Sequence, residues 1–196
     1  MTTSDAFNLS RSRGSVTLVG AGPGDPELLT LKAVRAIASA SVILVDDLVN
    51  EAVLEHAQAA ARVIYVGKRG GCKSTAQADI EAMMIAEASK GETVIRLKGG
   101  DPMIFGRAGE ELEALYKAGI ACSVVNGITA GLAASTSLAA PLTHRNHAHG
   151  VVFVTGHPQA GGQSADWVAL GDAAHKAKLT LVIYMGVSQA EKIQSG

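Results

Sequence analysis

The feature that most constrains the fold of this chain is the alternation of short apolar runs with longer segments of helical spacing. Each run is rich in valine, isoleucine and leucine and is apolar at nearly every position. This pattern predicts strands that are buried on both faces, as in a parallel sheet covered by helices. The runs are Val16–Val19, Val42–Val45, Arg62–Val66, Thr93–Leu97, Cys122–Val125, Val151–Thr155 and Leu181–Met185.

The segments between the first five runs carry apolar residues three and four positions apart, the spacing of an amphipathic helix. Asp25 followed by Pro26 is typical of a helix start. Strands that alternate with helices indicate an α/β fold, and we expect the first sheet to have five mostly parallel strands. Two stripes show the helical spacing: Leu28, Leu31, Val34 and Ile37, and then Ile80, Met83, Met84 and Ala88.

The boundary between two α/β domains is expected after the fifth run, where an Asn-Gly-Ile-Thr segment precedes an alanine-rich helix. We therefore predict a flexible extension over residues 1–14, an N-terminal domain over 15–126 and a partial C-terminal domain over 127–196. The second domain offers only two clear strands, so we expect it to be truncated at its C-terminus.

Composition excludes several classes of protein. Charged residues make up 18% of the 196 residues and the net charge is −1, so bulk charge does not indicate a nucleic-acid binder. Two cysteines, Cys72 and Cys122, give no disulfide framework, which favours a reducing, cytoplasmic compartment. The first 14 residues contain no apolar segment, so we expect no secretory signal there, and no apolar stretch is long enough for a membrane span.

The first glycine-rich loop, residues 20–25, is expected to connect a strand to a helix. It is similar to the dinucleotide fingerprint, but Asp25 stands at the third glycine and Pro23 removes an amide that could donate to a phosphate. The loop therefore argues against an NAD-dependent oxidoreductase. It is compatible with a plain tight turn or with a turn on which an uncharged ligand lies.

Asp46 and Asp47 follow the second run, at the sheet edge where open α/β folds bind ligands. A carboxylate there would act as a general base or accept a hydrogen bond from a ribose hydroxyl. A structural role explains these residues equally well, because the helix dipole favours an acidic residue near the start of a helix.

Two further loops follow the third and fourth runs. Lys68, Arg69 and Lys73 lie in a glycine-rich segment, and three cations at the ligand edge would suit an acidic substrate. The segment Gly99–Asp101 contains two successive glycines, whose lack of a Cβ would let a ligand approach the backbone closely. Asp101 is also a candidate helix cap.

His144, His147, His149 and His157 are close together in the sequence, which raises the question of a zinc site. No cysteine or carboxylate accompanies them at ligand spacing, so we expect no metal.

Eight motifs occur in order and together resemble the uroporphyrinogen-III C-methyltransferases of the tetrapyrrole methylase superfamily. The resemblance extends from about Gly14 to the last residue, and the KGGDPMIFGR and PLTHR motifs are the more specific ones. The motifs are VGAGPGDPELLTLKA, VDDLV, VGKRGG, RLKGGDPMIFGRAGEE, NGITA, PLTHR, VTGH and YMG.

This resemblance implies two α/β domains of the tetrapyrrole methylase type, a homodimer, and S-adenosylmethionine as methyl donor without a metal. The reaction implied is methylation of uroporphyrinogen III at C2 and C7 to give precorrin-2, on the way to sirohaem and cobalamin. Asp46 matches the proposed proton acceptor and Lys68 the proposed proton donor. The substrate carboxylates would face Arg69, Lys73, Arg107 and Arg145. The cofactor would contact Pro23, Gly99, Gly100, Asp101, Ile104, Thr129, Ala130 and Met185.

The chain departs from the family pattern at several positions. Val45 replaces a tyrosine, Asp47 adds a second carboxylate beside Asp46, and Asn126 replaces a proline. The methyltransferase is the leading interpretation. Asp47 and the expected truncation support the alternative, a non-catalytic fragment or paralogue that retains the fold.

Overall fold

The computed structural model describes residues 14–67, 75–157, 162 and 165–195. The chain divides after Thr129 into two compact units, each of which is described by itself.

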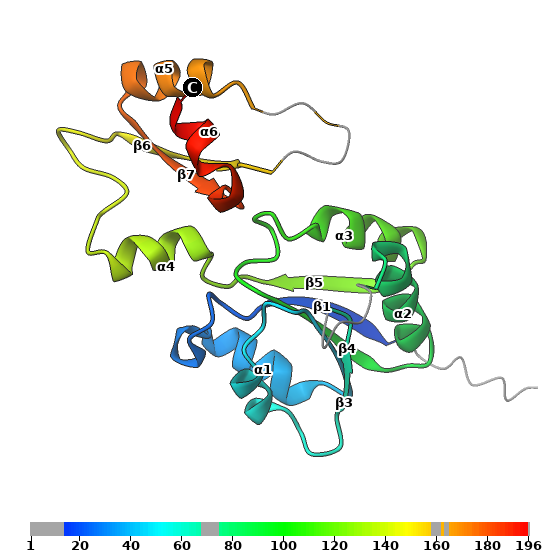
Figure 1. Ribbon diagram of the computed structural model, residues 1–196. Helices are drawn as coiled ribbons and strands as arrows, with labels where there is room; N and C mark the ends of the chain where they lie inside the picture. Colours follow the sequence, from blue (N-terminus) through cyan, green and yellow to red (C-terminus); the bar gives the residue numbers. More distant parts are fainter. Residues whose placement is uncertain (1–13, 68–74, 158–161, 163–164, 196) are drawn as a thin grey trace, which may run out of the picture. The chain divides into compact units, whose positions relative to one another are not determined.

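The first unit is built on a five-stranded parallel sheet with the strand order β3-β2-β4-β1-β5 (Figure 1). Every neighbouring pair is parallel, which confirms the fold class predicted from the apolar runs. The strands are β1 (Ser15–Gly20), β2 (Val42–Val45), β3 (Arg62–Tyr65), β4 (Thr93–Lys98) and β5 (Ala121–Val125).

Helices cover both faces of this sheet (Figure 1). On one face, Leu18, Leu44 and Val94 pack with side chains of α2 (Gln77–Ser89) and α3 (Ala108–Lys117). On the other face, Ile43, Ile95 and Leu97 pack with α1 (Leu31–Ser39) and with a 3₁₀ helix over Glu51–His56. The two apolar cores explain why β2, at the centre of the packing, is apolar on both faces.

The predicted stripe on the first helix is partly wrong. Leu28 belongs to a separate 3₁₀ helix, Pro26–Leu28, which Asp25 caps by accepting from the Glu27 amide. α1 begins only at Leu31, where Thr30 caps it by accepting from the amide of Ala33. Because the two helices are separate, Leu28 and Leu31 do not share one helical face. Leu31 is 74% exposed, while Ile37 is buried as expected.

The second unit contains a two-stranded parallel sheet formed by β6 (Gly150–Thr155) and β7 (Leu179–Tyr184). The helix α5 (Trp167–Ala177) precedes β7, and α4 (Ala130–Ser137) begins the unit. A 3₁₀ helix over Val187–Gln189 and α6 (Ala190–Ser195) follow β7. Across the described parts of both units, no helix combines the length and the apolar character that a membrane span requires.

Candidate functional site

The loops that follow β1, β4 and β5 meet at the carboxyl edge of the five-stranded sheet. Gly22 and Gly100 exchange backbone hydrogen bonds, with N–O distances of 3.1 Å and 2.7 Å. The amide of Ala21 donates to the carbonyl of Lys98 at 2.8 Å. Parallel strands present their carboxyl ends on one edge, so residues far apart in the sequence are brought together here.

Three glycines allow this close approach of backbones. A Cβ atom on Gly127 would lie 2.2 Å from the carbonyl oxygen of Gly100, and one on Gly20 would lie 2.5 Å from the amide nitrogen of Gly127. Gly100 also has a φ of 67°, a conformation that favours glycine. Backbone packing therefore explains glycine at these positions, and the predicted contact of Gly100 with the cofactor stays a prediction. A different contact explains glycine at position 99, since a Cβ there would lie 2.8 Å from the Leu48 side chain.

Asp101 joins the loops after β4 and β5. It is only 7% exposed. Its Oδ2 accepts from the Gly127 amide at 3.1 Å and from the Asn126 side chain at 3.2 Å, and its Oδ1 accepts from the Met103 amide at 2.8 Å. Both oxygens are thus engaged within the protein. Asp101 organises the edge of the sheet, whatever contact it makes with a ligand.

We expect Asp101→Asn to lower the free energy of unfolding by about 1–3 kcal/mol. An asparagine amide group must face at least one of the three donors, which leaves a buried N–H without an acceptor. Urea unfolding followed by circular dichroism measures the change. Unfolding at the same urea concentration as the wild type would show that these hydrogen bonds contribute little.

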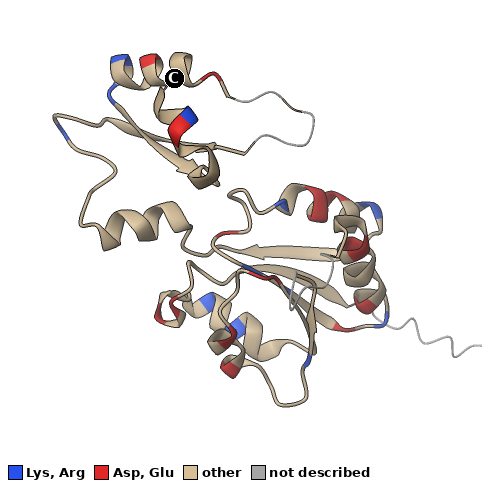
Figure 2. Cartoon of the chain, in the orientation of Figure 1, with Lys and Arg blue, Asp and Glu red and all other residues tan. Residues whose placement is uncertain are grey.

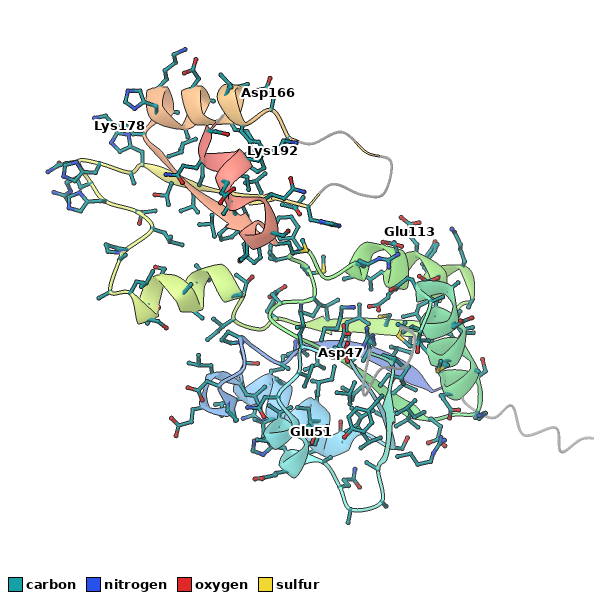
Figure 3. All side chains as sticks on the ribbon, in the orientation of Figure 1. Asp47, Glu51, Glu113, Asp166, Lys178 and Lys192 are labelled. Atoms are coloured by element: carbon teal, nitrogen blue, oxygen red, sulfur yellow. The ribbon has the colours of Figure 1, made fainter. Side chains whose placement is uncertain are left out.

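Asp46 lies directly after β2 at the same edge, with a side chain that is 36% exposed. Its Oδ2 accepts from the Arg96 guanidinium at 3.1 Å, and its Oδ1 accepts from the Asp47 amide at 3.0 Å. The neighbouring Asp47 is labelled in Figure 3. A carboxylate that is held by a cation but still reaches solvent can accept a proton from a bound substrate.

The structure adds three charged residues that the sequence did not single out. Arg96, Lys98 and Glu111 are all buried, and Glu111 receives hydrogen bonds from both cations. Burial lowers the pKa of the Lys98 ammonium, and the nearby Arg96 lowers this pKa further, while Glu111 opposes both effects. Most of the other acidic residues on α2 and α3 lie on the outer surface of the helices (Figure 2).

Of the cationic residues predicted to bind the substrate, some lie outside the described residues and Arg107 is engaged in an ion pair. Lys68, Arg69 and Lys73 lie outside the described residues. Arg107 forms a bidentate ion pair with Glu110, and its Nε and Nη2 donate at 2.8 Å and 2.6 Å. This ion pair raises the pKa of Arg107 and lowers that of Glu110.

Other predicted cofactor residues of the first unit surround the same edge or adjoin it in the sequence. Pro23 lies half-buried in the loop after β1, and Ile104 is half-buried three residues beyond Asp101. The amide of Ile104 donates to the carbonyl of Asp101 at 3.2 Å. Thr129 is buried at the end of the unit.

The second unit contains a groove of about 460 Å³ between α4 and β7. Ala130 and Met185 both line it, so two of the predicted cofactor contacts are brought together. The predicted last strand ends one residue early, because Met185 has a φ of 56° and leaves the sheet. The hydroxyl of Tyr184 accepts from the Gly131 amide at 2.9 Å and ties β7 to α4.

The histidine-rich segment forms a turn in the second unit, with Arg145 exposed on it. The rings of His144 and His147 stack with centroids 4.6 Å apart, and the amide of Asn146 donates to Nδ1 of His144 at 3.2 Å. Among the described residues, no three His, Cys, Asp or Glu side chains are grouped as metal ligands.

We expect the purified protein to retain no stoichiometric zinc, because the stacked histidines have no companion ligands among the described residues. Elemental analysis after exhaustive dialysis tests this expectation. One zinc ion per chain, lost on mutation of His144 to Ala, would contradict it.

Comparisons with known proteins agree on one family. The family described as Tetrapyrrole (Corrin/Porphyrin) Methylases matches residues 15–195. The chain is 56% identical over 183 residues to a uroporphyrinogen-III C-methyltransferase of Pseudomonas aeruginosa, covering 93% of this chain and 72% of that protein. It is 48% identical to siroheme synthase 1 of Aeromonas hydrophila, but spans only 39% of that longer protein.

Solved structures give the same result. The uroporphyrin-III C-methyltransferase from Thermus thermophilus, complexed with S-adenosyl homocysteine, is 42% identical with a TM-score of 0.74. The match covers 93% of this chain and 76% of that one. A cobalt precorrin-4 methyltransferase matches with a TM-score of 0.79 at 25% identity, covering 94% of this chain and 74% of that one.

Proposed function

Because this chain belongs to the tetrapyrrole methylase family, we propose that it transfers methyl groups from S-adenosylmethionine to C2 and C7 of uroporphyrinogen III. The product would be precorrin-2, a precursor of sirohaem and cobalamin. The observation that carries the proposal is the partly exposed Asp46 carboxylate held by Arg96 at the carboxyl edge of the sheet, in a chain 56% identical to a uroporphyrinogen-III C-methyltransferase.

Residues in each unit fit S-adenosylmethionine. The loop after β1 leaves open space at Gly24, where a Cβ would meet no atom within 4 Å, and Pro23 lies beside it. The groove of the second unit is lined mainly by apolar side chains, and Met185 is one of them. These surfaces suit the uncharged parts of a nucleoside. We assign Pro23, Gly99, Gly100, Asp101, Ile104, Thr129, Ala130 and Met185 to the binding of S-adenosylmethionine.

In the proposed mechanism S-adenosylmethionine supplies an already activated methyl group, so the protein mainly has to align the reactants. The pyrrole carbon that accepts the methyl group must afterwards lose a proton. Asp46 accepts that proton, because its carboxylate is paired with Arg96 and part of it remains exposed. Arg145, which is exposed, would bind a substrate carboxylate, together with Arg69 and Lys73. Lys68 would act as the proton donor, as the resemblance to the family implies.

When the substrate binds, Arg107 would break its ion pair with Glu110 and pair with a substrate carboxylate instead. Its ion pair with Glu110 is on the surface, with side chains 56% and 53% exposed. Surface ion pairs of this kind contribute only about 0–1 kcal/mol, so the exchange is energetically accessible. We also propose, from the resemblance to the family, a homodimer that acts in the cytoplasm without a metal.

Isothermal titration calorimetry with S-adenosylmethionine and with S-adenosylhomocysteine tests the cofactor part of this proposal. We expect both to bind at one site per chain and to compete with each other. The absence of any binding heat from a folded protein would favour the alternative of a fragment or paralogue that retains only the fold.

A further inference from the structure

A group of buried charges lies behind the Asp46 carboxylate. Arg96 and Lys98 alternate with apolar residues along β4, so their side chains are on the face that α2 and α3 cover. Arg96 is 2% exposed, Lys98 is 3% exposed and Glu111, from α3, is fully buried. Charges at such positions need compensation from neighbours, because burial removes their hydration.

Glu111 is the centre of this cluster. Its Oε1 accepts from Nε of Arg96 at 3.1 Å and from Nζ of Lys98 at 3.0 Å. The side-chain amide of Gln77, from α2, donates to the same oxygen at 3.3 Å. Its Oε2 is buried and has no hydrogen-bond partner among the described residues. One carboxylate therefore compensates two cations.

Arg96 connects the cluster to Asp46. While Nε donates to Glu111, Nη2 of the same guanidinium donates to Oδ2 of Asp46 at 3.1 Å, and Nη1 donates to the carbonyl of Leu97 at 3.3 Å. The guanidinium is planar, so these three contacts fix its orientation. Lys98, Glu111, Arg96 and Asp46 form a continuous series of two cations and two anions.

We propose that Glu111 and Lys98 are positioning residues that set the strength of the Arg96–Asp46 ion pair: Glu111 competes with Asp46 for the Arg96 guanidinium, and Lys98 limits that competition by pairing with Glu111. The inference rests on the proposed role of Asp46 as the proton acceptor. Loss of Glu111 leaves two cations that both act on Asp46, whereas loss of Lys98 leaves Glu111 to draw the guanidinium away from it. The two changes therefore act on Asp46 in opposite directions.

Other charged groups near the cluster must stay unchanged in a test. Arg107 and Glu110 at the start of α3 pair with each other, and Glu81 on α2 acts on Arg107. Asp47 is adjacent to Asp46 in the chain. Burial and Arg96 together lower the pKa of Lys98.

The test follows the carboxyl-carbon NMR signal of Asp46 against pH in the substrate-free protein, and the signal is assigned by its loss in Asp46→Asn. We expect Glu111→Gln to move the pH midpoint down by about one unit and Lys98→Met to move it up by about one unit. The double variant removes one charge of each sign and should titrate near the wild type. Midpoints that stay in place, or that move in the same direction in both single variants, would overturn the proposal. A clearly shifted midpoint in the double variant would also overturn it. Because the double variant keeps the balance of buried charge, it remains a test if a single variant fails to fold.

Single-turnover methyl transfer in the same variants separates this proposal from the function on which it rests. The midpoints of the pH–rate profiles should move in the same two directions, with unchanged affinity for S-adenosylmethionine. A purely structural role would lower the urea midpoint of unfolding without moving either titration. If the wild type transfers no methyl group, the proposed function fails, while the NMR result still decides whether Glu111 and Lys98 act on Asp46.

Discussion

Asp46→Asn should abolish most methyl transfer, with an expected loss of roughly 10²–10⁴-fold in the single-turnover rate. The amide keeps the shape of the side chain and can still accept from Arg96, but it cannot take up a proton. Affinity for S-adenosylmethionine should be unchanged, since the cofactor residues assigned to the glycine loops and to the groove are intact. Rapid quenching with labelled S-adenosylmethionine measures the rate, and calorimetry measures the affinity.

Asp47→Asn is the matched control for this prediction. It removes the adjacent carboxylate and keeps the backbone amide that donates to Oδ1 of Asp46. We expect this variant to retain most of the wild-type rate. An Asp46→Asn protein that transfers methyl groups as fast as the wild type would exclude Asp46 as the proton acceptor.

Gly127→Ala should be the most destabilising small substitution at the sheet edge. The added methyl would lie 2.2 Å from the carbonyl oxygen of Gly100 and 2.9 Å from Cα of Gly20, both backbone atoms held by their strands. Overpacking of this kind typically costs about 1–3 kcal/mol, and we expect the upper part of that range because backbone cannot rotate away. The midpoint of urea unfolding measures the loss. Affinity for S-adenosylmethionine should fall as well, since the same loops carry Pro23 and Asp101.

Gly109→Ala provides the control, because it is the same chemical change in a helix with open space around it. A Cβ on Gly109 would meet nothing within 4 Å. Alanine in a helix is favoured over glycine by about 0.5–1 kcal/mol, so this variant should be slightly more stable than the wild type. Equal stability of the Gly127→Ala and Gly109→Ala proteins would show that the loops can separate at little cost.

The fold of the first unit could be predicted because its central strands β1, β2 and β4 are buried on both faces. Apolar runs such as Val42–Val45 can only be accommodated between two layers of helices, and their order along the chain predicts parallel pairing. The helix starts were less predictable. Asp25 and Pro26 have the sequence of a helix start, yet they produce a 3₁₀ helix, and the longer helix α1 is capped by Thr30.

The exposed part of the candidate site could be predicted, whereas the buried part could not. Asp46 and Asp47 were both candidates because they follow a strand at the ligand edge, and the choice of Asp46 rests on the resemblance to the family. Arg96 and Lys98 carried a signal, namely two charged residues two positions apart within a strand whose other residues are mostly apolar. The sequence did not identify their partner, since Glu110 and Glu111 are adjacent on α3 and only the helical phase decides which one is buried. The helix begins after Arg107, whose φ of 56° is not indicated by the sequence.

Mass spectrometry of the tetrapyrrole after incubation with uroporphyrinogen III and methyl-labelled S-adenosylmethionine is the decisive test of the proposed reaction. We expect a product whose mass shows two labelled methyl groups, with only a trace formed by the Asp46→Asn protein. A folded wild-type protein that binds S-adenosylmethionine but leaves uroporphyrinogen III without label would refute methyl transfer to this substrate.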